Sequence, residues 1–161
     1  MSFSPIILTL SGVNLALHSA PGLEGDLTGD LQTLKQQGVS AMITTLTDEE
    51  LQRFGIAGLG PEAESQGIAW QHLPVKDKSL PDEAFEHHWP QAMEQLLPRL
   101  LGGERVSVHC RGGTGRTGLV AARLLLAAGI PLSEVVEAVR QARPGALASE
   151  EQVEYLSRHQ A

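Results

Sequence analysis

Cys110, the chain's only cysteine, stands at the start of a glycine-rich segment that ends in Arg116. The glycines between them, Gly112, Gly113 and Gly115, allow successive backbone N–H groups to turn inward and cradle phosphate-type oxygens. An arginine closes such a cradle with a two-pronged guanidinium, which a lysine cannot match. The same positive surroundings favour the thiolate, which is the nucleophilic form of cysteine. A nucleophile inside an oxyanion cradle predicts attack on phosphorus and a phosphocysteine intermediate.

Two flanking runs would position this segment. The apolar run Arg105–Val108 precedes it, and the helix-forming run Leu119–Ala128 follows it. This order predicts a strand, a tight loop and the start of a helix, where unpaired N–H groups and the helix dipole favour an anion. Between positions 105 and 133 the chain also carries four arginines and no acidic residue. We therefore expect Cys110 to lie in a positively charged loop.

Alternating strand-like and helix-like runs predict the rest of the fold. Pro5–Leu10 and Val13–His18 indicate an N-terminal β-hairpin around Ser11 and Gly12. The alternation beyond it is typical of an α/β fold in three layers, α/β/α, with a mainly parallel central sheet. Ligands of such sheets bind at the carboxyl ends of strands, which is where Cys110 falls. We expect further strands at 39–46, 68–75 and 105–110, and helices at 27–37, from 47, at 61–66, 83–101, 117–128, 131–142 and 149–159.

Two of the expected helices carry local signals at particular residues. Thr47 begins a short helix, with Glu50 at the spacing of a capping box. Pro90 and Pro98 fall inside the long helical run, where a proline is expected to kink or end a helix.

The residues around the loop match a known signature. Residues 109–118, His-Cys-Arg-Gly-Gly-Thr-Gly-Arg-Thr-Gly, resemble the signature of the cysteine-based protein phosphatases, both tyrosine and dual-specificity enzymes. Within that superfamily the chain is most similar to the kinase-associated phosphatases of the cyclin-dependent kinase inhibitor 3 type and their bacterial relatives. Residues 31–51, 72–82 and 143–146 support the resemblance, which spans roughly residues 15–157. It implies the three-layer cysteine-phosphatase fold.

The resemblance also implies an activity and a set of roles. The activity is hydrolysis of phosphotyrosine, phosphoserine or phosphothreonine in proteins, with Cys110 as the nucleophile and Arg116 as the phosphate clamp. His109 would order the loop and tune the thiolate, and Thr117 would donate to the cysteine sulfur and help the thiolate depart. The implied phosphate-binding residues are Arg111, Gly112, Gly113, Thr114, Gly115 and Arg116.

An acid must protonate the leaving oxygen of a phosphomonoester, so a carboxyl group has to reach the mouth of the loop. In the resembling family this acid lies on a loop upstream of the cysteine. Asp77 follows a strand-like run in a polar loop. Asp82 is the alternative, but it has the spacing of a helix N-cap. We therefore assign the role of general acid to Asp77.

Hydrolysis of a phosphocysteine requires a positioned water molecule, and this sequence lacks the residue that the resembling family usually places beside that water. Many members of the resembling family place a glutamine near position 148, where this chain has Ala148. Gln152, one helical turn further on, is a candidate substitute for positioning the water. The alternative is an ordinary solvated residue of the helix.

Composition narrows the class of protein further. The length of 161 residues and the 42% apolar content predict one domain, 1–161. A single cysteine excludes an internal disulfide and indicates a reducing compartment, and the N-terminus resembles no signal peptide, so we expect a cytoplasmic protein. No run approaches a membrane span, and the net charge of −7 argues against nucleic-acid and membrane-surface partners. The expected partner is a phosphoprotein substrate, with no metal and no cofactor.

Two other functions remain open at this point. Phosphoinositide and polynucleotide 5′-phosphatases use similar loops, and Arg111 fits the basic loops of lipid-acting members whereas Thr114 does not. A non-catalytic phospho-binding module would share the cradle but would not turn over its ligand. A sulfur-transfer enzyme of the rhodanese type is a more distant alternative, since its loop would not require the flanking histidine or Arg-Thr-Gly.

Overall fold

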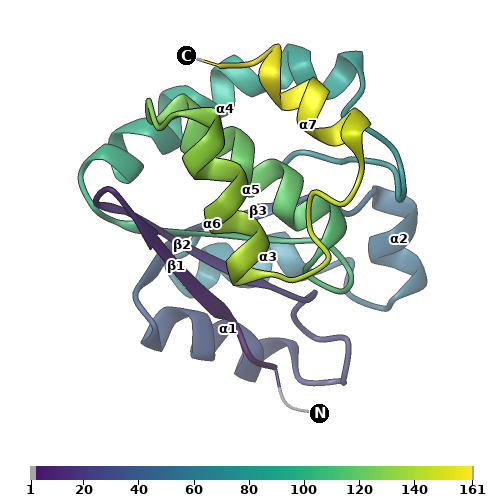
Figure 1. Cartoon of the computed structure of the whole chain (residues 1–161). Coiled ribbons are helices and arrows are strands. Elements are labelled where there is room, and N and C mark those ends of the chain that lie inside the picture. The colour runs from purple at the N-terminus through teal and green to yellow at the C-terminus, as the bar shows by residue number, and fades with distance from the viewer. Residues whose placement is uncertain (1–2, 161) are drawn as a thin grey trace.

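A five-stranded sheet forms the middle layer of the computed structural model, which describes residues 3–160 (Figure 1). Its first two strands, β1 (Ile6–Leu10) and β2 (Val13–His18), pair antiparallel as the predicted hairpin. Ser11 and Gly12 at the tip both have positive φ, 50° and 82°. This combination belongs to a two-residue turn of type I′, whose twist matches that of the flanking strands.

The other three strands are parallel to β2. They are β3 (Val39–Thr44), β4 (Ala69–His72) and β5 (Arg105–His109), and the sheet order is β1-β2-β5-β3-β4. The sheet is therefore mainly parallel, as predicted. Because β5 lies between β2 and β3, the segments that leave these two neighbours flank its carboxyl end.

Backbone hydrogen bonds hold the start of the Cys110 loop between those segments. The N–H of Ala20, after β2, donates to the carbonyl of Arg111 at 2.9 Å. The N–H of Thr45, after β3, donates to the carbonyl of His109 at 3.1 Å. The loop therefore leaves the carboxyl end of the central strand and is anchored to the segments on both sides of it.

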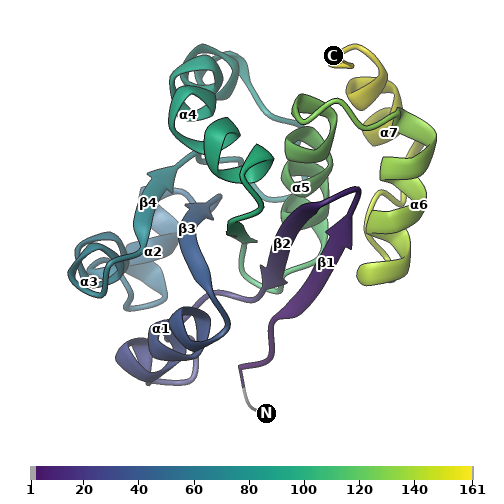
Figure 2. The ribbon, with the colours of Figure 1, turned by 90° about the vertical axis from the view of Figure 1, so that its left-hand side faces the viewer.

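Helices cover both faces of the sheet (Figures 1 and 2). One face carries α4, α5, α6 and α7, and the other carries α1, α2 and α3, so the three-layer α/β/α prediction is confirmed. Their bounds are α1 Leu27–Gln36, α2 Asp48–Arg53, α3 Leu59–Ser65, α4 Glu83–Leu101, α5 Gly115–Ala127, α6 Leu132–Ala142 and α7 Glu150–Ser157.

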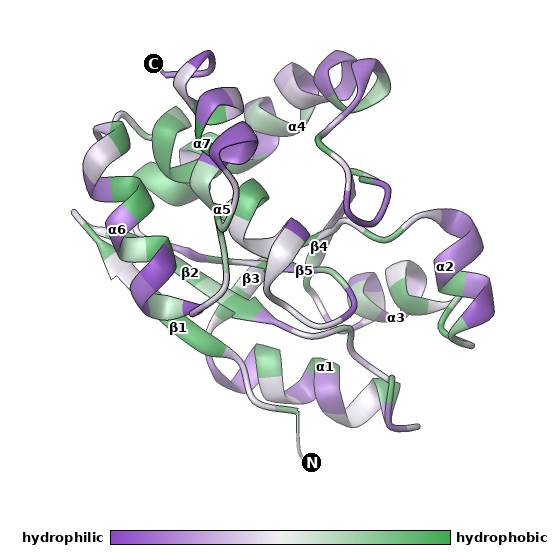
Figure 3. Ribbon diagram, turned by 45° about the vertical axis from the view of Figure 1, so that its right-hand side comes forward, coloured by the Kyte–Doolittle hydropathy of each residue, from purple (hydrophilic) through white to green (hydrophobic). Residues whose placement is uncertain are grey.

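The helix that follows the Cys110 loop, α5, is the most deeply packed. Every residue from 116 to 126 is buried, whereas hydrophilic residues gather on the outer turns of helices such as α2 and α7 (Figure 3). A Cβ on Gly118 would lie 2.6 Å from the Cβ of Ala146, so only glycine allows this close approach. The body of α5 is thus fixed by packing, whereas its first residue, Gly115, is exposed.

Helix α4 runs without a break across both of its prolines. The helix boundary expected as one alternative at Pro90 and Pro98 is therefore wrong. Both prolines lie on the exposed side, where water can satisfy the carbonyls that lose a partner. The opposite stripe is buried in the core, where its packing holds the helix together: Phe85, Trp89, Ala92, Leu96 and Leu100. No helix in the described part of the chain combines the length and apolar character that a membrane crossing requires.

The strand predicted over 68–75 is shorter in the sheet, because β4 ends at His72. The chain beyond it nevertheless stays attached to the segment that follows β3. The N–H of Leu73 donates to the carbonyl of Thr44 at 2.9 Å, and the N–H of Val75 donates to that of Thr45 at 2.8 Å. These bonds carry the chain toward the Cys110 loop and leave the carbonyl of Val75 facing it.

Candidate active site

The thiol of Cys110 lies at the carboxyl end of β5 and is 5% exposed. Its sulfur accepts hydrogen bonds from the N–H of Gly113 at 3.3 Å and from the hydroxyl of Thr117 at 3.1 Å. Burial alone would raise the pKa of the Cys110 thiol. The hydrogen bonds from Thr117 and Gly113 and the charge of Arg116 outweigh burial, so the pKa lies below its ordinary value. The site therefore stabilises the thiolate.

Gly113 gives the loop its shape. Its φ of +84° is left-handed, and a Cβ there would lie 2.6 Å from the carbonyl carbon of His18. Only glycine fits this position. At Gly112 and Gly115, by contrast, φ is not in the left-handed region and a Cβ would meet no neighbour within 4 Å. The requirement for glycine thus rests on one of the three positions.

Arg143 holds the outer side of the loop. Its Nη2 donates to the carbonyl of Gly112 at 2.9 Å and contacts the hydroxyl of Thr114 at 3.3 Å. The segment 143–146 therefore lies against the loop. The side chain of Arg111 points elsewhere, with its guanidinium 5.5 Å from the ring centroid of Phe54.

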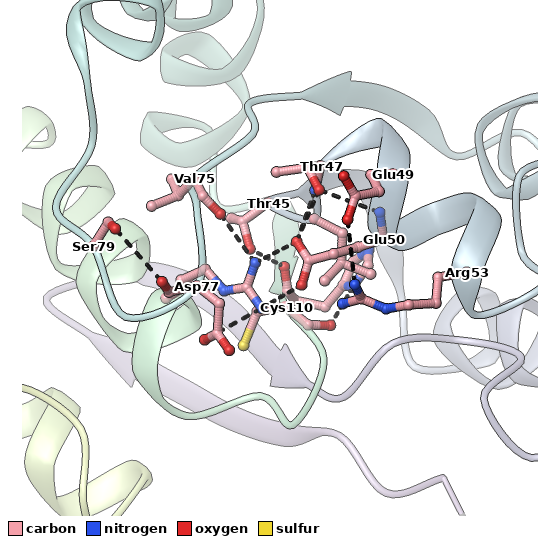
Figure 4. A network of polar contacts seen from close by, with 12 residues as sticks. Thr45, Thr47, Glu49, Glu50, Arg53, Val75, Asp77, Ser79 and Cys110 are labelled. Carbon is pink, nitrogen blue, oxygen red and sulfur yellow. Dashed lines mark hydrogen bonds and ion pairs between the residues drawn. The ribbon is translucent and has the colours of Figure 1, made fainter.

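Arg116, in the first turn of α5, is 6% exposed, and its guanidinium is held by acceptors from two other segments. The acceptor residues, Glu50 and Val75, lie close to Asp77 and Cys110 in Figure 4. Nη1 donates to Glu50 Oε1 at 2.7 Å and to the carbonyl of Val75 at 2.9 Å, and Nη2 donates to Glu50 Oε2 at 3.0 Å. These bonds use three of the five N–H groups of an arginine. No hydrogen bond to another residue within 3–160 uses the N–H of Nε or the second N–H of Nη2, although Nη2 also lies 3.6 Å from Asp77 Oδ1. These two N–H groups lie on one side of the guanidinium and form a side-on fork.

Glu50 is the site residue that sequence reasoning missed. Its carboxylate completes the predicted capping box of α2 with Thr47 and also pairs with Arg116, 66 positions away. Burial would raise the pKa of Glu50, but the hydrogen bonds from Arg116 and Thr47 outweigh it and lower that pKa. The capping-box spacing identified Glu50 as a helix-capping residue but did not predict its ion pair with Arg116.

Asp77 lies in the loop after β4, and its carboxyl group is close to the same guanidinium. Its Oδ1 is 3.6 Å from Arg116 Nη2, and the side chain is 66% exposed at the mouth of the site. Asp82 instead accepts a hydrogen bond from the N–H of Phe85 at 3.0 Å as the N-cap of α4. The structure thus brings Asp77, and not Asp82, to Arg116.

His109 is fully buried behind the loop. Its Nδ1 is 2.9 Å from the carbonyl oxygen of Cys110, and its Nε2 is 2.7 Å from the hydroxyl of Thr44. Burial, with the nearby charges of His72 and Arg116, lowers the pKa of His109 to about 4, so the ring is neutral near pH 7. A neutral ring that contacts the Cys110 carbonyl can order the loop.

An open hollow of about 720 Å³ lies beside Asp77 and Arg116, and both Ala148 and Gln152 line it. Gln152 also closes a capping box with Ser149, because its Oε1 accepts from the N–H of Ser149 at 3.3 Å. The carboxamide oxygen of Gln152 therefore also serves as a helix cap, and its amide nitrogen has no hydrogen bond to another described residue. Within residues 3–160, no group of three or more His, Cys, Asp or Glu side chains is arranged to hold a metal ion.

The contribution of the Glu50–Arg116 ion pair to stability can be tested by removing the charge of Glu50. Glu50→Gln keeps the shape and the capping acceptor but removes the nearer and more buried of the two carboxylates beside the Arg116 guanidinium, so we expect a loss of about 3 kcal/mol of stability at pH 7. Because the folded pKa of Glu50 is lowered, its contribution is complete above the ordinary glutamate pKa of about 4.3 and is lost as pH falls through the folded value.

Urea unfolding of the wild type and Glu50→Gln at pH 7 and about pH 3 measures this dependence. The matched control is Glu49→Gln, on the same helix, because Glu49 is exposed and pairs only with Arg53 among described residues. The difference between wild type and Glu50→Gln should shrink at low pH. An equal difference at both pH values would show that the charge of Glu50 does not matter.

Comparison with known proteins places this geometry among phosphatases. The PTP-SAK family model, described as "Swiss Army Knife protein, DSP-PTPase phosphatase domain", matches residues 12–156. Cyclin-dependent kinase inhibitor 3 of Rattus norvegicus is 31% identical over 161 residues, which cover 92% of this chain and 74% of that protein.

Two solved structures extend the comparison to the fold. A crystal structure of kinase associated phosphatase, with its catalytic-site cysteine replaced by serine, matches with a TM-score of 0.83 and 28% identity over 97% of this chain and 93% of that one. The active form of Tk-PTP matches with a TM-score of 0.71 and 26% identity over 96% and 95% of the two chains.

Proposed function

This chain belongs to the PTP-SAK family of dual-specificity protein phosphatase domains, and from that membership we propose that it hydrolyses phosphotyrosine and phosphoserine or phosphothreonine in proteins through a phosphocysteine intermediate. The observation that carries the proposal is the side-on fork of Arg116, which lies beside a hydrogen-bonded Cys110 thiol. Two parallel N–H groups suit two phosphate oxygens. We assign the whole chain, 1–161, to one phosphatase domain.

In the first step, the Cys110 thiolate attacks phosphorus opposite the leaving oxygen. A P–S bond forms, the P–O bond to the tyrosine, serine or threonine breaks, and Asp77 transfers its proton to the departing oxygen. Arg116 and the N–H groups of the loop hold the equatorial oxygens, where negative charge concentrates. These fixed donors supply the charge stabilisation, so the proposed mechanism uses no cofactor.

In the second step, water attacks the phosphocysteine. A P–O bond forms, the P–S bond breaks, and the Asp77 carboxylate takes the proton of the water. The hydroxyl of Thr117, 3.1 Å from the sulfur, stabilises the thiolate as it departs. With Ala148 at the usual glutamine position, we assign the placement of the water to the side-chain amide of Gln152, which lines the same hollow as Asp77.

The net charge of the chain and its single free thiol provide the basis for proposing a partner and a cellular compartment. Two of the similar proteins, cyclin-dependent kinase inhibitor 3 and kinase associated phosphatase, are named for kinases, which supports a phosphoprotein as the substrate. The net charge of −7 disfavours nucleic acid or an anionic membrane surface. The single free thiol suits a reducing compartment, which is the basis for a cytoplasmic assignment.

The test of this proposal is to trap the intermediate. A ³²P-labelled phosphotyrosine peptide is mixed with the wild-type protein, the reaction is quenched in acid, and the labelled peptide is identified by mass spectrometry. We expect the label on the peptide that contains Cys110. Parallel assays use phosphoserine, phosphothreonine and phosphoinositide substrates.

Each alternative has its own outcome in this experiment. If kcat/KM is higher for phosphoinositides than for every phosphopeptide, the substrate is a lipid and not a protein. Tight binding of phosphopeptides without release of phosphate would indicate a phospho-binding module. Turnover with no label on Cys110 would reject the phosphocysteine mechanism.

A further inference from the structure

A line of three hydrogen bonds runs across the sheet from Trp70 to the backbone of Cys110. The indole Nε1 of Trp70, on β4, is 2.7 Å from the hydroxyl of Thr44 at the end of β3. That hydroxyl is 2.7 Å from Nε2 of His109 at the end of β5. The opposite ring nitrogen, Nδ1, is 2.9 Å from the carbonyl oxygen of Cys110.

The groups at the two ends determine the direction of every proton in this line. An indole N–H can only donate, and a carbonyl oxygen can only accept. His109 Nδ1 must therefore carry the proton that is donated to the Cys110 carbonyl. In a neutral ring Nε2 is then an acceptor, so the Thr44 hydroxyl donates to it and accepts from Trp70. All donors and acceptors are satisfied in this one arrangement, which an imidazolium at His109 would break.

Packing holds each member of the line in place. Thr44 and His109 are completely buried. Trp70 lies so close to α3 that a Cβ on Gly60 would be 2.4 Å from its ring, and it stacks on His72 with ring centroids 5.1 Å apart. The inner two members are therefore shielded from water, and Trp70 is held at the partly buried outer end.

We propose that Thr44 and Trp70 are positioning residues, which fix His109 as the neutral Nδ1–H form and so keep the Cys110 carbonyl turned away from the phosphate site. A carbonyl that turned inward would place a partial negative charge against both the thiolate and the phosphate. Neither residue touches the substrate in this proposal. It rests on the proposed function, because it assumes that Cys110 is the nucleophile.

The charged and titratable groups around His109 come from three elements. His18 on β2 stacks on its ring at 5.3 Å, and His72 on β4 and Arg116 on α5 act on it through charge. None of the variants used below changes these three groups. In the Thr44 variants, a change in the behaviour of the thiol would therefore report the altered hydrogen bonds, whereas Trp70→Phe also alters the ring that stacks on His72.

The test compares Thr44→Val, Thr44→Ser and Trp70→Phe with the wild type. Thr44→Val removes the hydroxyl at nearly constant shape, and Thr44→Ser restores it. The matched control is Ser107→Ala on β5, which also deletes a fully buried hydroxyl, one without a hydrogen-bond partner among the described residues. The readouts are kcat/KM on a phosphopeptide and the pH dependence of Cys110 alkylation by iodoacetate.

We expect Thr44→Val to lower kcat/KM by roughly 10- to 100-fold and to shift alkylation to higher pH, since a loosened loop stabilises the thiolate less. Trp70→Phe should move both readouts in the same direction by less, because the Thr44 hydroxyl remains. Thr44→Ser should resemble the wild type, and Ser107→Ala should be unchanged. If Thr44→Val matches Ser107→Ala in both readouts while Cys110→Ser is inactive, the positioning inference is wrong and the proposed function stands. If Cys110→Ser is fully active, the proposed function itself has failed.

A direct measurement on the wild type does not depend on whether a variant folds. Histidine ¹⁵N spectra distinguish a protonated ring nitrogen from an unprotonated one. For His109 we expect a protonated Nδ1 and an unprotonated Nε2 at pH 7, unchanged down to about pH 5 because its pKa is about 4. A protonated Nε2 at pH 7 would overturn the inference.

Discussion

Cys110→Ser is expected to lower kcat by at least roughly 10⁴-fold, in line with the loss of other enzyme nucleophiles. The loop stabilises a thiolate through hydrogen bonds from Gly113 and Thr117 and the charge of Arg116. A serine hydroxyl receives the same contacts, but it stays protonated near pH 7, so the strong nucleophile that a thiolate provides is lost. His109 does not serve as a general base, because its Nδ1–H points at the backbone.

Binding should survive this substitution. The donors that hold phosphate belong to the loop backbone and Arg116, and serine leaves them in place. Hydrolysis of para-nitrophenyl phosphate and a phosphopeptide measures turnover, and calorimetry with the same phosphopeptide measures affinity. We expect an affinity within a few-fold of the wild type and an unchanged thermal midpoint. Turnover at the wild-type rate by a serine variant whose mass has been verified would exclude Cys110 as the nucleophile.

The fold could be predicted because its signals are local. The hairpin follows from two β-forming runs and a two-residue turn, and the strand, loop and helix around Cys110 follow from an apolar run, glycines and a helix-forming run. Helix α1 lies within one residue of its predicted end. Each of these features depends on neighbours in the chain, which periodicity and turn residues report directly.

The partners of the site residues could not be predicted in the same way. Glu50 meets Arg116, and Trp70 meets His109 through Thr44, only because β5 inserts between β2 and β3 in the sheet order. Sequence patterns indicate that strands exist and do not give their order. Glu50 and Trp70 therefore looked like an ordinary helix cap and an ordinary strand residue.

Gln152 illustrates a different limit. Ala148 precedes α7 and Gln152 lies in its first turn, and both line the hollow beside Asp77. The capping bond of Gln152 with Ser149 was not expected, although both residues are close in sequence. Glutamine at the third position of a helix that begins with serine is a capping signal, and the signal was present in the chain.

Asp77→Asn is expected to lower kcat by roughly 10²–10⁴-fold on alkyl phosphates, the range for loss of general acid–base catalysis. Asparagine has a similar shape, so it should keep the side chain beside Arg116 and remove only the proton and the charge. Phosphoserine and phosphothreonine leave as poor alkoxides and need that proton most. A substrate with a good leaving group, such as para-nitrophenyl phosphate, should lose less in its first step.

The pH–rate profile gives a second and independent readout. Where the wild type loses activity at high pH because its acid has lost a proton, that limb should flatten in Asp77→Asn. The matched control is Asp82→Asn, five positions away, whose carboxylate caps α4 through the N–H of Phe85. Asparagine caps a helix about as well as aspartate, so Asp82→Asn should lose only the interaction of its charge with the helix dipole, less than about 1 kcal/mol of stability, and leave the kinetics nearly unchanged. If Asp82→Asn instead shows the dependence on leaving group and the flattened limb while Asp77→Asn does not, the acid is Asp82, and the proximity of Asp77 to Arg116 is a structural ion pair.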